Sequence, residues 1–374
     1  MTDKTYSTNL TYGKDKQPVR NANYDLLRII ATVAVIMIHV NWLYFGKSYE
    51  VYSSNISWVI ESLINIVTRF SVPCFVMISG AFNLNNAANA GIRYFYKKTS
   101  YRIFLPFAAV LVFEIITTIL MNLLLHRDLD CELKGFFTYG IYNSWYMYML
   151  LGVYLLTPFI VKLKTHLSWN SYRICAAVLL AWAVISQSSS AQKTAYSIGV
   201  VVAYLGYYLT GDVIRSEISK CTTESKKKII LCASIVSLFA VGITFWARAT
   251  GINYYIEDWS TNFFSPTIVL YSICVFCIFS VISVKGGARL YRLSKQTYFI
   301  YLFHTMIMIL LHYIVKEKIG NELLAIAILS ILTSVVSLLC AICFEKIWNF
   351  ICVKFSIEEK WKHMKIWQSR STPR

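Results

Sequence analysis

The chain has 374 residues, of which 57% are hydrophobic and only 15% are charged, with a formal net charge of +17. About a quarter of the residues in a typical soluble domain are charged, so this composition, with a mean hydropathy of +0.53, predicts a membrane protein and excludes a disordered or fibrous chain. The positive charge would favour nucleic-acid binding in a soluble protein, but in a membrane protein it is expected in the loops between spans.

Residues 1–23 form a polar N-terminal tail with scattered lysines. The tail lacks the apolar core and the small-residue cleavage site of a secretory signal peptide. The first apolar segment is therefore expected to remain in the mature protein as a membrane span.

Ten apolar segments follow the tail, and we predict that each crosses the membrane as a helix, because a hydrocarbon core about 30 Å thick needs roughly 20 helical residues. The fifth is short for a perpendicular crossing. The predicted fold is an all-α polytopic integral membrane protein with about ten spans: 24–45, 57–82, 103–125, 144–161, 172–186, 196–213, 229–247, 263–284, 297–315 and 322–350.

The distribution of Lys and Arg predicts the orientation of these spans. Basic residues concentrate in the N-terminal tail, in the even-numbered loops and in the C-terminal tail. The positive-inside rule places these segments in the cytoplasm, so both termini are expected there. Omitting one span would put the basic loop 215–228 outside, which supports an even count. We expect one membrane domain, 24–353, a basic cytoplasmic tail, 354–374, and a multi-pass location in a bacterial inner or plasma membrane.

Two Cys-x-x-Cys pairs lie in apolar segments, and no nearby His or Asp completes a metal site. Cysteine packs as a small hydrophobic residue in such places, so packing is favoured over zinc or redox chemistry. No metal ligand is predicted. The pairs are Cys274 with Cys277 and Cys340 with Cys343.

Ionisable residues inside spans are costly and are functional candidates by default. They are Asp25, Arg28, His39, Glu61, Arg69, Glu114, His304 and His312. Arg28 and His39 are eleven residues apart, which on an α-helix is three turns plus about 20° and roughly 16 Å of rise. One helix face thus carries a cation near the cytoplasmic mouth and a titratable base near the bilayer midplane. Asp25, three residues before Arg28, is placed to orient the guanidinium.

A structural interpretation exists for each of these residues. Arg28 alone is explained equally well as a snorkelling residue at a helix end, and His39 as a histidine that bridges two helices. Because the two share one face, we favour a functional role for the pair.

At this point the sequence resembles the acyltransferase-3 family of integral-membrane O-acyltransferases. The family's Arg-x10-His motif in the first helix is matched in spacing by Arg28 and His39. Within the family the chain looks most similar to the enterobacterial common antigen O-acetyltransferase type, although Ile29, Cys74 and Ala81 depart from residues frequent among relatives. Further similar segments occur in the family's order: 69–80 ending in Ser79 and Gly80, Lys97 and Lys98 with 102–106, 144–158, and Tyr298 to His304.

The resemblance implies an acyl-CoA-dependent transferase, most simply of acetyl groups, that acts on a hydroxyl of a cell-surface polysaccharide or lipid-linked sugar. Basic residues at the cytoplasmic mouth would hold the phosphates of acyl-CoA: Arg28, Lys97, Lys98 and Arg102. His39 would act as general base toward the acceptor hydroxyl; an acyl-histidine intermediate is the alternative. No permanently bound cofactor is expected, and acyl-CoA is a co-substrate.

The remaining candidates have paired interpretations. Ser79 is favoured as a packing or donor-positioning residue over a nucleophile. Tyr298, Tyr301 and His304 form a stripe that would line the donor channel. Arg69 and Glu114 reach similar depths and are expected to form an ion pair or to contact the acceptor. Trp145 marks the membrane interface or stacks on a sugar.

A transporter or exporter of a polar or lipid-linked substrate is the alternative function, since buried charges would suit it as well. Paired Gly- or Pro-broken helices, which are typical of transporters, are not evident in the sequence. A purely structural role would not explain the intramembrane ionisable residues. The expected partners are acyl-CoA, the glycan or lipid-linked acceptor, the lipid bilayer and, in a homo-oligomer, a second copy of the chain, but not nucleic acid.

Overall fold

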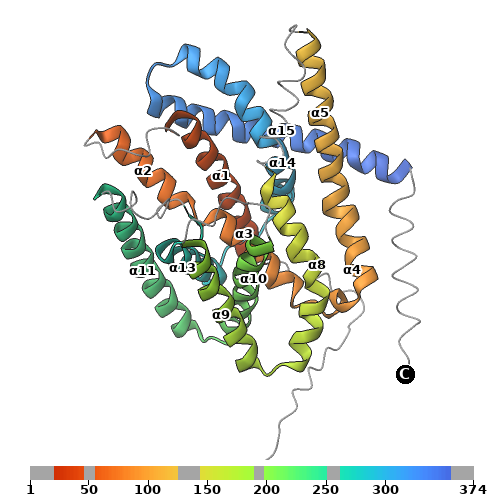
Figure 1. Cartoon of the computed structure of the whole chain (residues 1–374), viewed down its shortest axis with the longest axis vertical. Helices are drawn as coiled ribbons and strands as arrows, with labels where there is room; N and C mark the ends of the chain where they lie inside the picture. The colour runs from red at the N-terminus through yellow and green to blue at the C-terminus, as the bar shows by residue number, and fades with distance from the viewer. Residues whose placement is uncertain (1–20, 46–54, 125–143, 189–197, 251–261, 355–374) are drawn as a thin grey trace, which may run out of the picture.

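The computed structural model describes residues 21–45, 55–124, 144–188, 198–250 and 262–354, and every element within these ranges is helical (Figure 1). The all-α prediction is therefore confirmed for the described part of the chain. The predicted tails lie outside the described residues except at their inner ends. The elements are α1 (Ala22–Phe45), α2 (Ile56–Thr68), α3 (Ser71–Asn83), the 3-10 turn η2 (Ala87–Ala90), α4 (Ile92–Thr99), the π-helical turn η3 (Ser100–Phe104), α5 (Leu105–Leu124), α8 (Trp145–His166), α9 (Trp169–Ser188), α10 (Ile198–Ile218), α11 (Thr223–Ala249), α13 (Pro266–Val281), α14 (Ala288–Lys318) and α15 (Glu322–Lys354).

Eight helical segments of the described chain are long and apolar enough to cross a membrane. They coincide with eight of the predicted spans, including the short fifth one, and they indicate a multi-pass membrane protein. The other two predicted spans fall on α10 and α13. Helix α13 has 16 residues, fewer than a perpendicular crossing needs, and three tyrosines and Asp212 lower the hydropathy of α10. The count of ten and the cytoplasmic location of both termini stay predictions.

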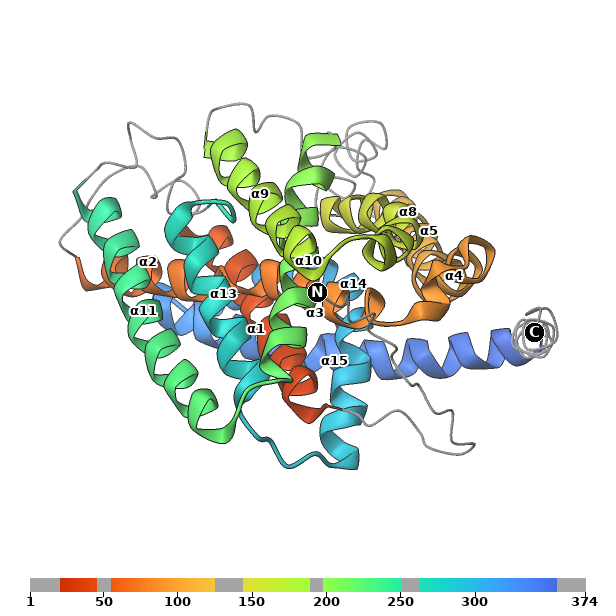
Figure 2. The same cartoon turned by 90° about the horizontal axis from the view of Figure 1, so that it is seen from below.

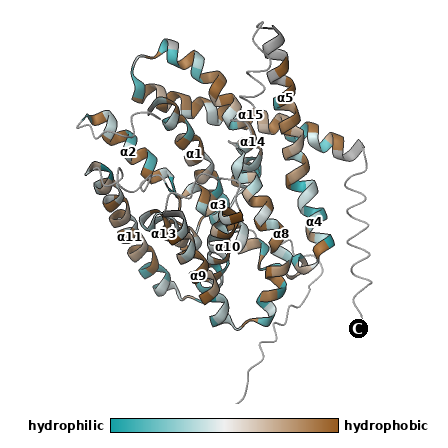
Figure 3. Ribbon diagram, viewed as in Figure 1, coloured by the Kyte–Doolittle hydropathy of each residue, from teal (hydrophilic) through white to brown (hydrophobic). Residues whose placement is uncertain are grey.

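Hydrophobic residues predominate along α5 (Figure 3), and α5, α11 and α15 all carry exposed large apolar side chains. Leu238 and Phe239 on α11 are 75% and 68% exposed, and Ile331 on α15 is 64% exposed. Large apolar side chains at such exposure are unfavourable in water but are at home in hydrocarbon. These helices therefore present the surface expected for contact with lipid.

Helices α3 and α10 meet backbone to backbone at the centre of the bundle. A Cβ atom on Gly80 would lie 1.8 Å from the carbonyl oxygen of Tyr208, and one on Gly211 would lie 2.1 Å from the carbonyl oxygen of Met77. Glycine permits this approach because it has no side chain. The two residues thus fix the distance between the helices.

A buried carboxylate beside this contact ties further elements to α10. Asp212 is completely buried, and it accepts hydrogen bonds from Lys164 Nζ on α8 at 2.6 Å and from the Tyr172 hydroxyl on α9 at 2.7 Å. Asn85, just after α3, donates a third. Because a buried charge is tolerated only when it is paired and hydrogen-bonded, this network holds the ends of four helices together.

Helix α1 runs parallel to α14, and the two touch at three levels. Ser294 Oγ donates to Asp25 Oδ1 at 2.6 Å, the rings of His39 and His304 lie 5.2 Å apart, and those of Tyr44 and His312 lie 5.0 Å apart. The view from below (Figure 2) shows α3, α10 and α14 near the middle of the molecule, with α11 on one flank and the end of α15 reaching out on the other. The α1 and α14 pair is therefore the scaffold on which the candidate site is built.

The glycine contact predicts a specific sensitivity to a single methyl group. Gly211→Ala should lower the midpoint of thermal unfolding, because overpacking against a backbone atom costs about 1 to 3 kcal/mol. Gly242→Ala on α11 is the matched control, since a Cβ there meets nothing within 4 Å, and it should leave the midpoint unchanged or raise it. The measurement is intrinsic fluorescence during heating of the purified protein in detergent. Equal midpoints for Gly211→Ala and wild type would contradict the account.

Candidate active site

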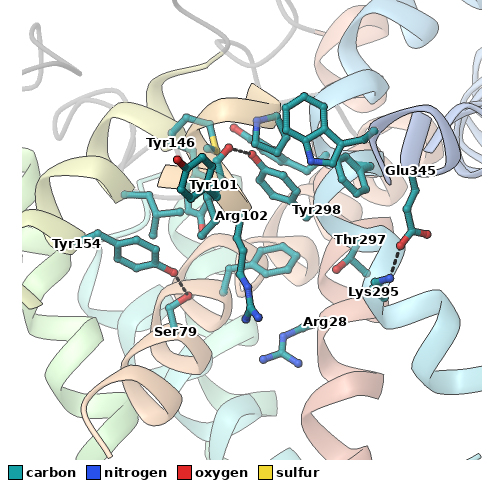
Figure 4. A pocket seen from close by; sticks show the side chains of 18 of the residues that line it. Arg28, Ser79, Tyr101, Arg102, Tyr146, Tyr154, Lys295, Thr297, Tyr298 and Glu345 are labelled. Atoms are coloured by element: carbon teal, nitrogen blue, oxygen red, sulfur yellow. Dashed lines mark hydrogen bonds and ion pairs between the residues drawn. The ribbon is translucent and has the colours of Figure 1, made fainter. Parts of the chain in front are cut away.

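A pocket of about 730 Å³ opens inside the bundle (Figure 4). It is lined by residues of α1, α3, η3, the start of α5, α8, the first half of α14 and the last turns of α15. Its walls combine cationic side chains with aromatic rings and hydroxyl groups. The polar residues include Arg28, Ser79, Arg102, Tyr154, Lys295, Tyr298, Tyr301 and Glu345. Arg28, Ser79, Arg102, Tyr298 and Tyr301, all selected from the sequence, are thus brought together in one cavity.

Arg28 is held by its neighbours on α1 and α3. Its Nη1 donates to Asp25 Oδ1 at 3.1 Å, and its guanidinium lies over the ring of Phe82 at 5.3 Å. Asp25 is only 3% exposed and also accepts the Ser294 hydroxyl. Asp25 does not line the pocket itself. It orients Arg28, which does, through a charge-assisted hydrogen bond.

The π-helical turn η3 brings Arg102 into the pocket. A π turn inserts an extra residue into a helix and rotates the side chains that follow, and such turns are frequent at functional sites. Tyr298 on α14 donates its hydroxyl to the carbonyl oxygen of Ile103 within this turn. In Figure 4 the guanidinium groups of Arg28 and Arg102 face the same part of the pocket. Two guanidinium groups in this arrangement suit the oxygens of a phosphate.

Ser79 lies on the opposite wall, next to Gly80 of the glycine contact. The Tyr154 hydroxyl on α8 donates to Ser79 Oγ at 3.4 Å. Ser79 is thus placed at the pocket surface by the close packing of α3 on α10. Its neighbours in the pocket are Phe75 and Tyr154.

Beyond the pocket, a row of rings in tilted or edge-on contact connects Tyr146 and Tyr301 with the two histidines. The ring of Tyr301, which lines the pocket, lies 5.3 Å from that of Tyr146 and 5.5 Å from that of His304. The next ring is His39, 5.2 Å from His304. Neither histidine lines the pocket wall. They lie behind Tyr301, whose ring contacts that of His304.

A backbone contact of His304 determines which ring nitrogen carries the hydrogen when the imidazole is neutral. His304 Nδ1 contacts the carbonyl oxygen of Tyr301, one turn earlier on α14. A carbonyl can only accept, so Nδ1 carries the hydrogen in the neutral ring and Nε2 keeps its lone pair. The Thr305 hydroxyl lies 3.4 Å from Nε2. His304 is 2% exposed, and its Nε2 is a base in a largely water-free place.

Arg69 and Glu114 both lie in the part of the bundle that contains the histidines. Arg69 Nε donates to Asn65 Oδ1 at 2.8 Å, and its guanidinium lies 5.3 Å from the ring of Phe263. Arg69 lies within coulombic range of His39, and Glu114 lies within coulombic range of Tyr301. The ion pair between Arg69 and Glu114 stays a prediction.

Trp145 begins α8 and joins an aromatic cluster inside the bundle. Its ring lies 5.9 Å from that of Tyr204 and 6.2 Å from that of Phe263. Because the guanidinium of Arg69 also lies over the ring of Phe263, Trp145 lies near Arg69. Contact with the acceptor stays a prediction for Trp145.

Lys97 and Lys98 are not among the residues that line this pocket. Lys98 Nζ donates to Asn89 Oδ1 at 3.3 Å and lies 5.7 Å from the ring of Tyr94. A role of the two lysines in binding acyl-CoA stays a prediction.

Several residues of the pocket were not selected from the sequence. Lys295 precedes the predicted ninth span, and Trp348 and Asn349 end the tenth, where interfacial charges and indoles are common. The available signal was helical spacing: Lys295 is three residues before Tyr298, and Trp348 and Asn349 are three and four residues after Glu345, so each pair shares a helix face. The missed residues with functional side chains are Tyr101, Tyr154, Tyr291, Lys295, Glu345, Trp348 and Asn349.

Because Ser294 donates a hydrogen bond to the buried carboxylate of Asp25, we expect it to contribute to the stability of the fold. Ser294→Ala removes a hydrogen bond to a buried carboxylate and should lower the free energy of unfolding by about 1 to 3 kcal/mol. Ser219→Ala is the control, because the exposed Ser219 hydroxyl, just after α10, donates only to the carbonyl of Ser216 in the last turn of that helix. Thermal unfolding in detergent provides the comparison, and equal loss in both variants would show that Ser294 has no special role.

Comparison with known proteins adds the family. A family model described as an acyltransferase domain, that of acyltransferase-3, matches residues 21–342. No curated protein and no solved structure matches the chain. The matched segment contains all elements that line the pocket except the last turns of α15, where Glu345, Trp348 and Asn349 lie. The match covers most of the chain, and the protein therefore belongs to the acyltransferase-3 family of membrane acyltransferases.

Proposed function

We propose that the protein transfers an acyl group, acetyl in the first instance, from acyl-CoA to a hydroxyl group of a cell-surface polysaccharide or lipid-linked sugar. The observation that carries this proposal is the pocket in which Arg28 and Arg102 converge and from which Tyr301 leads to His39 and His304. Membership of the family supports acyl transfer in general and does not favour a transporter.

The donor would enter at the end of the bundle where Arg28 and Arg102 lie, which the charge distribution assigns to the cytoplasm. Acyl-CoA is polyanionic at its nucleotide and carries the thioester at the end of a long flexible arm. Guanidinium groups bind phosphate oxygens bidentately and hold the anion by charge as well. The arm would then run along the face of α1 toward His39, roughly 16 Å farther along the helix.

The reaction would take place at the two histidines. The imidazole of His39 accepts the proton of the acceptor hydroxyl as its oxygen attacks the thioester carbonyl. The tetrahedral intermediate then collapses, the C–S bond breaks, and the leaving thiolate of CoA takes the proton from the His39 imidazolium, which restores the neutral base. His304 lies against His39, and its Nε2 is available to accept a hydrogen bond from the His39 ring or from the acceptor.

The acceptor would approach from the side of the histidines away from the donor pocket. Arg69, Trp145 and Glu114 would contact the acceptor, because an aromatic ring beside polar groups suits a sugar and stacks on the apolar face of the sugar ring. By its resemblance in sequence, we propose an O-acetyltransferase of the enterobacterial common antigen type in a bacterial inner membrane.

Substitution of His39 tests the chemical step. His39→Ala should lower the rate of free thiol release from acetyl-CoA about 10²- to 10⁴-fold, because a positioned general base contributes that much. His166→Ala, at the exposed end of α8, should retain the wild-type rate. The assay follows thiol release by the purified protein in detergent, in which slow hydrolysis reports the activity without the acceptor. If His39→Ala released thiol as fast as wild type, the base assignment would be wrong.

Substitution of Arg102 tests donor binding separately. Arg102→Ala should raise the KM for acetyl-CoA at least about tenfold with kcat little changed, because a hydrogen bond to a charged group contributes about 1.5 to 3 kcal/mol. The matched control is Arg289→Ala, which removes an exposed cation from the first turn of α14 outside the pocket. A rise in KM that is equal in both variants would point to loss of general surface charge and would count against a phosphate site at Arg102.

A further inference from the structure

One wall of the pocket is unlike the rest, because it is made by the adjoining ends of α14 and α15 and lies partly outside the segment matched by the family model. On α15, Glu345, Trp348 and Asn349 are spaced i, i+3 and i+4 and therefore share one helix face. On α14, Tyr291 and Lys295 line the same part of the pocket, and Lys295 pairs directly with Glu345. This wall combines an indole, an amide and a balanced ion pair.

The indole of Trp348 is held firmly from behind. It is stacked on the ring of Phe344 with an angle of 12° between the planes and 6.0 Å between the centroids. Phe344 in turn packs against Phe299 and Phe303 on α14, each at 5.3 Å. Trp348 is half-buried and lines the pocket. A ring that is fixed in this way forms a stacking platform that loses little conformational entropy when a ligand binds.

The charge of Glu345 is already compensated. Its carboxylate accepts hydrogen bonds from Gln296 and pairs with Lys295, as the dashed line in Figure 4 shows for Lys295. Glu345 therefore does not cancel the positive charge of Arg28 and Arg102, and the pocket has a cationic part and a neutral aromatic part. The exposed amide of Asn349, next to Trp348, offers one donor group and one acceptor.

We propose that Trp348 and Asn349 form the nucleobase subsite for the donor, in which the adenine of acyl-CoA stacks on the indole and its edge meets the Asn349 amide. This inference rests on the proposed function, and it adds the part of the donor that the arginines do not explain. Adenine is a flat, neutral ring with polar edges, and in acyl-CoA it lies beside phosphates. The pocket has the matching arrangement, with the Trp348 indole in the same cavity as two guanidinium groups. Stacking of a base on an aromatic ring contributes about 1 to 3 kcal/mol, which corresponds to roughly a 5- to 150-fold change in affinity.

Binding of two thioesters that differ only in the nucleotide tests the subsite. Acetyl-CoA and acetyl-4′-phosphopantetheine are titrated calorimetrically into the full chain in detergent. Trp348→Ala should lower the affinity for acetyl-CoA at least about fivefold and leave the affinity for acetyl-4′-phosphopantetheine unchanged. Trp348→Phe should retain most of the affinity for acetyl-CoA. Adenosine 3′,5′-bisphosphate should compete with acetyl-CoA for wild type and compete less well for Trp348→Ala.

Trp246→Ala is the matched control, because Trp246 on α11 is 59% exposed and lies outside the pocket. It should change neither affinity. Equal weakening of both thioesters by Trp348→Ala, or weakening of neither, would overturn the subsite and leave Trp348 as an interfacial residue. Failure of the proposed function is distinguishable: wild type would then bind acetyl-CoA without releasing thiol, or bind neither thioester, and the latter result would overturn both proposals.

Discussion

The parallel contact of α1 with α14 is the arrangement on which the candidate site depends. At one end, Ser294 donates to the buried Asp25, and Asp25 holds Arg28 at the pocket. Farther along the same two helices, His39 meets His304. The contact therefore positions both the arginine that we propose to bind the donor and the histidine that we propose as the base, and it separates them by the length of α1 between Arg28 and His39. A shift of one helix along the other would break both at once.

The cost of burying charge explains how the rest of the bundle is organised around this pair. Asp212 is surrounded by donors from three other segments, and the buried Glu61 pairs with Arg248 at 3.3 Å. Such pairs are needed because an uncompensated ion in a low-dielectric interior is strongly destabilising. At the pocket, Arg28 is paired with Asp25 as well, and 29% of its side chain stays exposed beside the cavity that Arg102 also lines. Two guanidinium groups that line one cavity support the proposal of an anionic ligand there.

Helical periodicity was sufficient to predict the local part of the site. The spacing of Asp25, Arg28 and His39 places them correctly on one helix, and apolar length located the helices themselves. Contacts between distant segments could not be derived in this way. Nothing in the sequence indicated that His304 packs against His39, that a π turn at 100–104 directs Arg102 inward, or that Gly80 and Gly211 bring two backbones together. These features arise from tertiary packing, for which helix periodicity carries no information.

The most direct measurement of the central claim is the structure of the purified protein with an acetyl-CoA analogue in which a methylene group replaces the thioester sulfur, determined by electron cryo-microscopy. The account predicts that the phosphates lie between Arg28 and Arg102 and that the acyl carbonyl lies beside His39 and His304. Density for the analogue outside this pocket, or an acyl group that ends far from His39 while the phosphates are bound, would contradict it.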